Sequence, residues 1–125
     1  MEAAAVKQSA DPCADFDLDV KKVWNAKVKL KVSTAMKEAG LEGGATKSVE
    51  IETKMDHITR DWVMLKQSAC NDHFKRNLLS REEYKAKAEC FDAYLQNARA
   101  MVAALAGGDM GAGERLADLR HPAGV

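Results

Sequence analysis

The sequence is poor in aromatic residues and has no excess of charge of either sign. Aromatic side chains make up 6% of the 125 residues, so any core has to be built from aliphatic residues, methionine and alanine. The 19 basic residues equal the 19 acidic ones, so overall charge does not indicate a nucleic-acid or anionic-surface partner. The length suits one small domain but not two.

Long apolar runs and closely spaced cysteine pairs are also missing. No stretch approaches the length of a membrane-spanning helix, and the first residues lack the apolar core of a secretory signal. The cysteines are Cys13, Cys70 and Cys90, and an odd number without a close pair fits a reducing compartment better than a disulfide scaffold. We therefore expect a cytoplasmic protein, with a signal that has already been removed as the open alternative.

The cysteines also raise the question of a zinc site or a disulfide, and the sequence favours neither. Cys70 and His73 are spaced like a ligand pair, and Cys13 and Cys90 would complete a set of four, but a second closely spaced pair is missing. A Cys70–Cys90 disulfide needs both side chains on one flank of a helix pair, whereas their heptad positions point to opposite flanks. We predict no metal site and leave the oxidation of Cys70 and Cys90 open.

Two segments repeat apolar residues at alternating intervals of four and three, which is the pattern of a helix with one apolar seam. The spacing predicts one helix over about 47–77 and another over about 81–106. Because the turn between them is short, the two helices are expected to be antiparallel neighbours. The seam residues are Ile51, Met55, Ile58, Trp62, Leu65 and Ala69 in the first helix and Tyr84, Ala88, Phe91, Leu95, Ala98, Val102 and Leu105 in the second.

The turn and the register of this hairpin also follow from the sequence. Ser80 and Glu83 have the spacing of a capping box, so the second helix is expected to start at Arg81. Pairing the two seams outward from the turn places Trp62 opposite Ala98, large opposite small, as a packed core requires. A long antiparallel helical hairpin is therefore predicted.

Residues 15–33 alternate between apolar and charged side chains, which is typical of a strand with one apolar face. We predict an amphipathic β segment over about 15–33, as one long strand or a hairpin. A helix is the alternative, because lysine, alanine and methionine are good helix formers. In the hairpin, Asp17 would face Lys29. The apolar residues predicted to mediate assembly are Phe16, Leu18, Val20, Trp24, Val28, Leu30 and Val32.

A run of lysines overlaps this segment, since residues 21–37 contain six lysines and no acidic residue. Such a run can bind nucleic acid or an anionic lipid surface, but it lacks arginine, the usual fork for phosphates and bases. We expect a solvated face of the β segment and keep anion binding as the alternative. The possible anion-binding residues are Lys21, Lys22, Lys27, Lys29 and Lys31.

No combination of residues points to catalysis. His57 and Asp61 have the spacing of an exposed pair on a helix, and a Cys70–His73 nucleophile would lack an orienting group. The glycine-rich stretches are not placed between a strand and a helix, as phosphate-binding loops are. We expect no enzymatic activity and no cofactor.

The second helix carries apolar residues beyond its seam, namely Tyr94 and Met101. Two helices cannot bury this surface on each other, so it has to meet the β segment or another subunit. Tyr94 and Met101 are therefore added to the residues predicted to mediate assembly.

Together these features predict a mainly α protein of the α+β class. It would have a polar leader at 1–14, one domain at 15–106 and a mobile glycine-rich tail at 107–125. The predicted function is non-catalytic: self-assembly as a homo-oligomer, or binding of another protein, through the β segment and the coiled-coil-like hairpin. Binding of nucleic acid or an anionic membrane through the lysine run is one alternative. An oligomeric β-barrel pore is another, because its strands also alternate apolar and charged residues.

Overall fold

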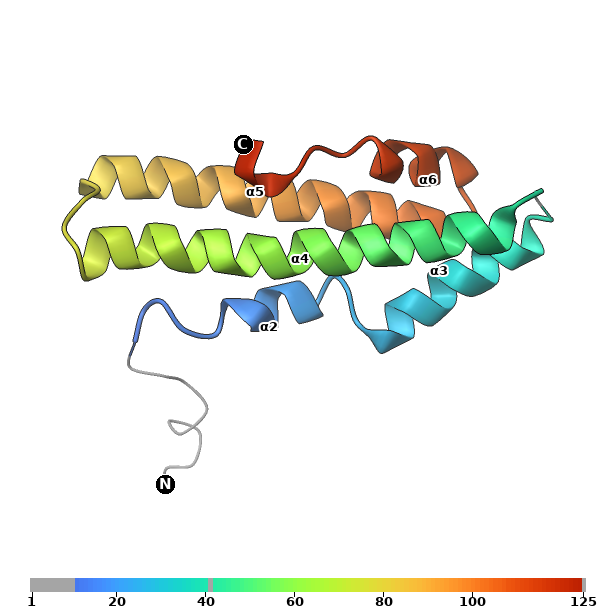
Figure 1. Ribbon diagram of the computed structural model, residues 1–125, viewed down its shortest axis with the longest axis horizontal. Coiled ribbons are helices and arrows are strands. Elements are labelled where there is room, and N and C mark those ends of the chain that lie inside the picture. Colours follow the sequence, from blue (N-terminus) through green and yellow to red (C-terminus); the bar gives the residue numbers. More distant parts are fainter. Residues whose placement is uncertain (1–10, 41, 125) are drawn as a thin grey trace, which may run out of the picture.

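Two long antiparallel helices form the body of the molecule, and shorter helices cover them (Figure 1). The structure is a computed structural model and describes residues 11–40 and 42–124. The two long helices are α4 (Gly44–Phe74) and α5 (Arg81–Ala106). The shorter elements are α2 (Phe16–Lys21) and α3 (Ala26–Glu38) before them, and α6 (Met110–Ala117) and the 3₁₀ helix η1 (Pro122–Gly124) after them.

The predicted helical hairpin is confirmed by α4 and α5. The second helix has the predicted bounds, and the first begins and ends a few residues earlier than predicted. The capping box is formed, because the backbone N–H of Glu83 donates to Ser80 Oγ at 3.1 Å and the N–H of Ser80 donates to Glu83 Oε1 at 2.9 Å. This backbone hydrogen bond from Ser80 lowers the pKa of Glu83.

The seam between α4 and α5 is the core of the protein. At its centre the Trp62 indole is 1% exposed, and its Nε1 donates to the carbonyl oxygen of Phe91 at 2.7 Å. One cluster surrounds this indole and contains Val23, Ala69, Phe91 and Leu95. A second cluster, nearer α6, contains Trp24, Val32, Met36, Ile51, Met55, Ile58, Val102, Leu105, Ala112 and Leu116.

The predicted β segment is wrong: residues 15–33 lie in α2, a short loop and α3, and the described ranges contain no strand. Positions four apart share a face both in a strand and in a helix, so the spacing of Trp24, Val32 and Met36 satisfies either pattern. These three residues are buried. Leu30 lies between them in the sequence and is 67% exposed, as helix geometry requires and as a buried strand face would not allow.

The charges of this segment also pair differently from the prediction. Asp17 pairs with Lys21, four residues later on α2, at 3.3 Å. Lys29 pairs with Asp56 of α4 at 2.8 Å and not with Asp17. The Asn25 side chain caps the start of α3. Local helical contacts and one contact to α4 therefore replace the predicted cross-strand pairs.

The glycine-rich tail is predicted from the sequence to be mobile. In the structure it contains α6 and packs against the hairpin. Leu116 on α6 is 1% exposed. Further along, the Tyr94 hydroxyl donates to the carbonyl oxygen of Arg120, and His121 Nε2 lies 2.8 Å from Asp61 Oδ2. Burial raises the pKa of Tyr94 to about 12. Part of the surplus apolar flank of α5 is thus covered by this same chain.

Replacing Trp62 with alanine is expected to lower the free energy of unfolding by about 3–5 kcal/mol, because it leaves a cavity in the seam. Met64→Ala is the matched control, since Met64 is on the same helix but 60% exposed. The control is expected to cost less than about 1 kcal/mol. Urea unfolding followed by far-UV circular dichroism measures both values. Equal losses in the two variants would contradict the placement of Trp62 in the core.

Candidate functional site

A groove runs between α5 and the segment formed by α2 and α3. It consists of three adjoining hollows of about 360, 380 and 310 Å³. The first and second hollows share Lys22, Val23 and Arg99 in their walls, and the second and third share Lys31 and Ala106. We call these three hollows the α5 groove.

One face of α5 sets the length of the α5 groove. Asp92 lines the first hollow and Ala106 lines the third. At roughly 1.5 Å per helical residue, the stretch between them is about 21 Å long. Arg99, Val102 and Ala103 lie within this stretch and line the second hollow, at spacings that place them on the same side of the helix. The groove is therefore long enough for about four turns of a helix.

The second hollow combines apolar lining with uncompensated positive charge. Val23 and Val102 line it and are buried. Its charged residues are Lys22, Lys31 and Arg99, and none of the acidic residues in the described ranges lines it. Within residues 11–40 and 42–124, none of these three side chains has an ion-pair or hydrogen-bond partner. The second hollow therefore carries a local excess of positive charge.

The first hollow contains a buried lysine whose charge is already balanced. Lys66 comes from α4, and its side chain is only 9% exposed. Its Nζ pairs with the Asp92 carboxylate and lies 5.0 Å from the Trp62 ring centroid and 5.1 Å from that of Phe16. Two aromatic faces and one carboxylate replace the water that this ammonium group gives up. Asp92 is therefore engaged with Lys66 and forms no ion pair with Arg99, and Asp19 is the other acidic residue that lines this hollow.

Lys29 points to the other side of α3 and belongs to a structural contact. Asp56 receives hydrogen bonds from Lys29 Nζ at 2.8 Å and from Trp24 Nε1 at 2.7 Å. Burial raises the pKa of Asp56, but the hydrogen bonds from Lys29 and Trp24 outweigh this effect, so the pKa lies below its ordinary value. This carboxylate ties α3 to α4.

The structure thus divides the lysines that the sequence singled out for anion binding. Lys22 and Lys31 line the α5 groove. Lys21 and Lys29 are engaged in ion pairs with Asp17 and Asp56. Lys27 is exposed and lines none of the three hollows.

The apolar residues predicted to mediate assembly serve mainly inside the chain. Leu18 and Leu30 are exposed, and Leu30 lines the third hollow of the groove. The other residues are buried or partly buried against the two core clusters, namely Phe16, Val20, Trp24, Val28, Val32, Tyr94 and Met101. Most of the predicted assembly surface therefore packs within the chain.

Arg99 is the groove residue that sequence reasoning missed. It directly follows the seam residue Ala98, so its place beside the apolar face of α5 could have been read from the heptad pattern. Its proximity to Lys22 and Lys31 could not, because that depends on how α3 packs against α5.

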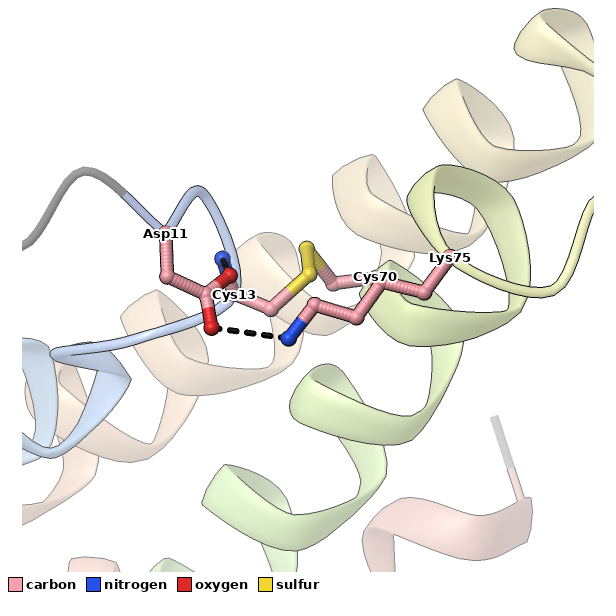
Figure 2. Close-up of a disulfide and its surroundings, with 4 residues drawn as sticks. All are labelled: Asp11, Cys13, Cys70 and Lys75. Atoms are coloured by element: carbon pink, nitrogen blue, oxygen red, sulfur yellow. Dashed lines mark hydrogen bonds and ion pairs between the residues drawn. A yellow bond between two sulfur atoms is a disulfide. The ribbon is translucent and has the colours of Figure 1, made fainter.

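A disulfide between Cys13 and Cys70 fixes the α2 end of the groove against α4 (Figure 2). The Cα atoms are 5.5 Å apart, and both residues are buried. Beside this bond, the Asp11 carboxylate accepts hydrogen bonds from Lys75 Nζ at 2.8 Å and from the Cys13 N–H at 2.9 Å, and both lower the pKa of Asp11. The sequence did not predict this pairing. Cys90 is a free, exposed thiol.

The disulfide also argues against the zinc site that was considered from the spacing of the cysteines and His73. The sulfur atoms of Cys13 and Cys70 are bonded to each other, so they are not available as ligands. In the part of the chain that the structure describes, no three His, Cys, Asp or Glu side chains are grouped to hold a metal ion.

None of the helices in the described ranges combines the length and apolar character needed to cross a membrane. No protein-family model, curated protein or solved structure matches this chain.

Asp56→Asn is expected to weaken the dependence of stability on acid pH. Because the folded-state pKa of Asp56 is lowered, its contribution is complete above the unfolded-state value of about 4 and is lost as the pH falls through the folded-state value. The variant lacks this loss, so its thermal midpoint should fall less than that of the wild type between neutral pH and roughly pH 2. Thermal unfolding over this range measures it.

Glu52→Gln is the control for this experiment, because Glu52 is exposed on the same helix and forms no ion pair within the described ranges. It should leave the acid dependence unchanged. An Asp56→Asn variant with the acid dependence of the wild type would show that the Lys29–Asp56 contact does not form in solution.

Proposed function

We propose that this chain is a non-catalytic partner-binding protein whose α5 groove takes up an acidic, partly apolar segment of another protein. The observation that carries the proposal is the second hollow, where Lys22, Lys31 and Arg99 lie beside an apolar lining that includes the partly or fully exposed Val28, Ala103 and Ala106. Among the described residues, no acidic one lines this hollow. Accessible apolar lining supplies the affinity of such a site when a ligand covers it, and the surrounding charges supply orientation and the rate of association.

The dimensions support an amphipathic helix as the bound element. A groove between packed helices of about 21 Å matches a segment of about 14 residues, with apolar anchors at helical spacing. Acidic residues on both sides of these anchors would face the three cations. The acidic residues of the groove lie in its outer hollows, namely Asp19 and Asp92 in the first and Glu38 in the third, so the middle of the segment should carry the negative charge.

Nucleic acid, the alternative drawn from the lysine run, has less support. Among the residues that the structure describes, no aromatic one lines any of the three hollows, so these residues offer no stacking platform for bases. Three uncompensated cations are also few for a site that has to hold a phosphate backbone.

The disulfide supports an oxidising compartment for this function, because such bonds rarely persist where glutathione and thioredoxin keep thiols reduced. This proposal replaces the cytoplasmic location expected from the odd cysteine count.

Peptide selection on the oxidised chain tests the proposal and does not require the partner to be identified first. A random displayed peptide library should yield sequences that combine acidic and aliphatic residues. A selected peptide should bind Lys31→Glu and Arg99→Glu about tenfold more weakly each, as measured by fluorescence anisotropy, because each variant loses a charge-assisted contact. Lys37→Glu is the control, since Lys37 is an exposed residue of α3 outside the groove.

Three results would contradict the proposal: no enrichment, enrichment of basic peptides, or equal weakening by the Lys37→Glu control. Tight binding of a mixed-sequence oligonucleotide at physiological salt, lost in Lys31→Glu, would favour the nucleic-acid alternative instead.

A homo-oligomer is a second proposal, and the tip of the hairpin supports it. Phe74 is 51% exposed and Leu78 is 69% exposed, at the turn that joins α4 and α5. Light scattering at micromolar concentration should give a multiple of the chain mass, and Leu78→Ser should lower it to that of one chain. Leu18→Ser, at an exposed leucine of α2, is the control. A wild-type mass equal to one chain would exclude self-assembly at that concentration.

A further inference from the structure

The segment from Asp11 to Trp24 forms one end of the α5 groove. Two points near its ends hold it to the rest of the protein, in addition to the Asp11–Lys75 ion pair and the packing of Phe16 and Val20. At one point Cys13 is bonded to Cys70. At the other, Val23 and Trp24 are buried, 4% and 5% exposed. Between these points α2 has six residues and no fully buried side chain.

Such a short helix cannot persist without its attachments. Isolated helices of fewer than about 12 residues are marginal in water, because nucleation costs more than a few hydrogen bonds return. The apolar contacts of α2 come from Phe16 and Val20, which are only partly buried. The disulfide keeps these side chains near α4, and so it sustains the packing of α2 by raising its effective concentration there.

The position of α2 determines the shape of the groove. Asp19 and Lys22 form part of the wall of the first hollow, and Lys22 also lines the second. The ammonium group of Lys66 lies over the ring of Phe16 as well as over that of Trp62. If α2 leaves, the groove loses one of its three uncompensated cations and the first hollow opens to water.

We propose that the Cys13–Cys70 disulfide makes partner binding conditional on oxidising surroundings, because it keeps α2 in place as a wall of the α5 groove. This regulation rests on the proposed function of that groove. The reductant is a dithiol: one of its thiolates attacks a sulfur of the disulfide to form a mixed disulfide, and its second thiol displaces the remaining cysteine. Two electrons and two protons pass to Cys13 and Cys70, which become thiols, while the dithiol becomes a disulfide.

Access to the bond is itself controlled by the structure. Cys13 is 3% exposed and Cys70 is 0% exposed, so a thiolate reaches neither sulfur until the segment around Asp11 opens. The Asp11 carboxylate binds both Lys75 Nζ and the Cys13 N–H, and so it opposes this opening (Figure 2). Lys75→Gln should therefore speed reduction by dithiothreitol several-fold, whereas Lys85→Gln on α5 should not.

The main experiment uses the full chain with Cys90→Ser, which prevents thiol exchange with the free cysteine. The oxidised chain is compared with the chain reduced by dithiothreitol and with a Cys13→Ser, Cys70→Ser variant. Hydrogen exchange should show lost protection in residues 16–24 on reduction, with α4 and α5 still protected. The selected peptide should bind the reduced chain and the double variant about tenfold more weakly, as expected when α2 is docked in only a tenth of the molecules.

Each other outcome overturns the inference. Unchanged protection of residues 16–24 would show that α2 stays without the disulfide. Unchanged or tighter peptide binding after reduction would show that the α5 groove binds the peptide without α2. The proposed function would not be contradicted by that result. Loss of all helical signal would make the bond a general requirement for folding and not a control of the groove. If no peptide binds the oxidised chain, the proposed function fails and this regulation fails with it, while hydrogen exchange still reports whether the bond holds α2.

Discussion

The burial of Trp62 between α4 and α5 is the contact on which the other elements depend. Its indole fills the centre of the seam and donates a hydrogen bond to Phe91. The ammonium group of Lys66 lies over the Trp62 ring, and it also lies over the ring of Phe16 on α2. The position of α2, and with it one end of the α5 groove, is therefore built outward from this single side chain.

The hairpin could be predicted because its signals are local and redundant. Apolar positions at intervals of three and four extend over many turns, and Ser80 and Glu83 define the start of α5 within four residues. The segment 15–33 was predicted as a strand because residues four apart share a face in both structures. Only the exposure of Leu18 and Leu30 separates the two, and exposure depends on the fold.

The candidate site shows the same limit. Lys22 and Lys31 could be selected from the sequence as possible anion-binding residues, because charge runs are visible in one dimension. Arg99 lines the same hollow as Lys22 and Lys31, whereas Lys29 forms an ion pair with Asp56. Both facts depend on contacts between helices that are distant in the sequence, so the sequence alone did not predict them. The bond between Cys13 and Cys70 spans 57 residues and gave no local signal, since neither cysteine has a nearby partner in the chain.

This bond also turns the stretch from Cys13 to Cys70 into a covalent ring that encloses α2, α3 and most of α4. A single backbone cut inside a ring opens it but does not divide the molecule. Gly40 and Gly43, between α3 and α4, are exposed and have left-handed backbone angles, and exposed glycines between helices are the kind of site at which proteases cut. An oxidised chain cut there remains one molecule, with α3 tethered at its start through α2 and the sulfur bridge and held along its length by the buried Val32 and Met36.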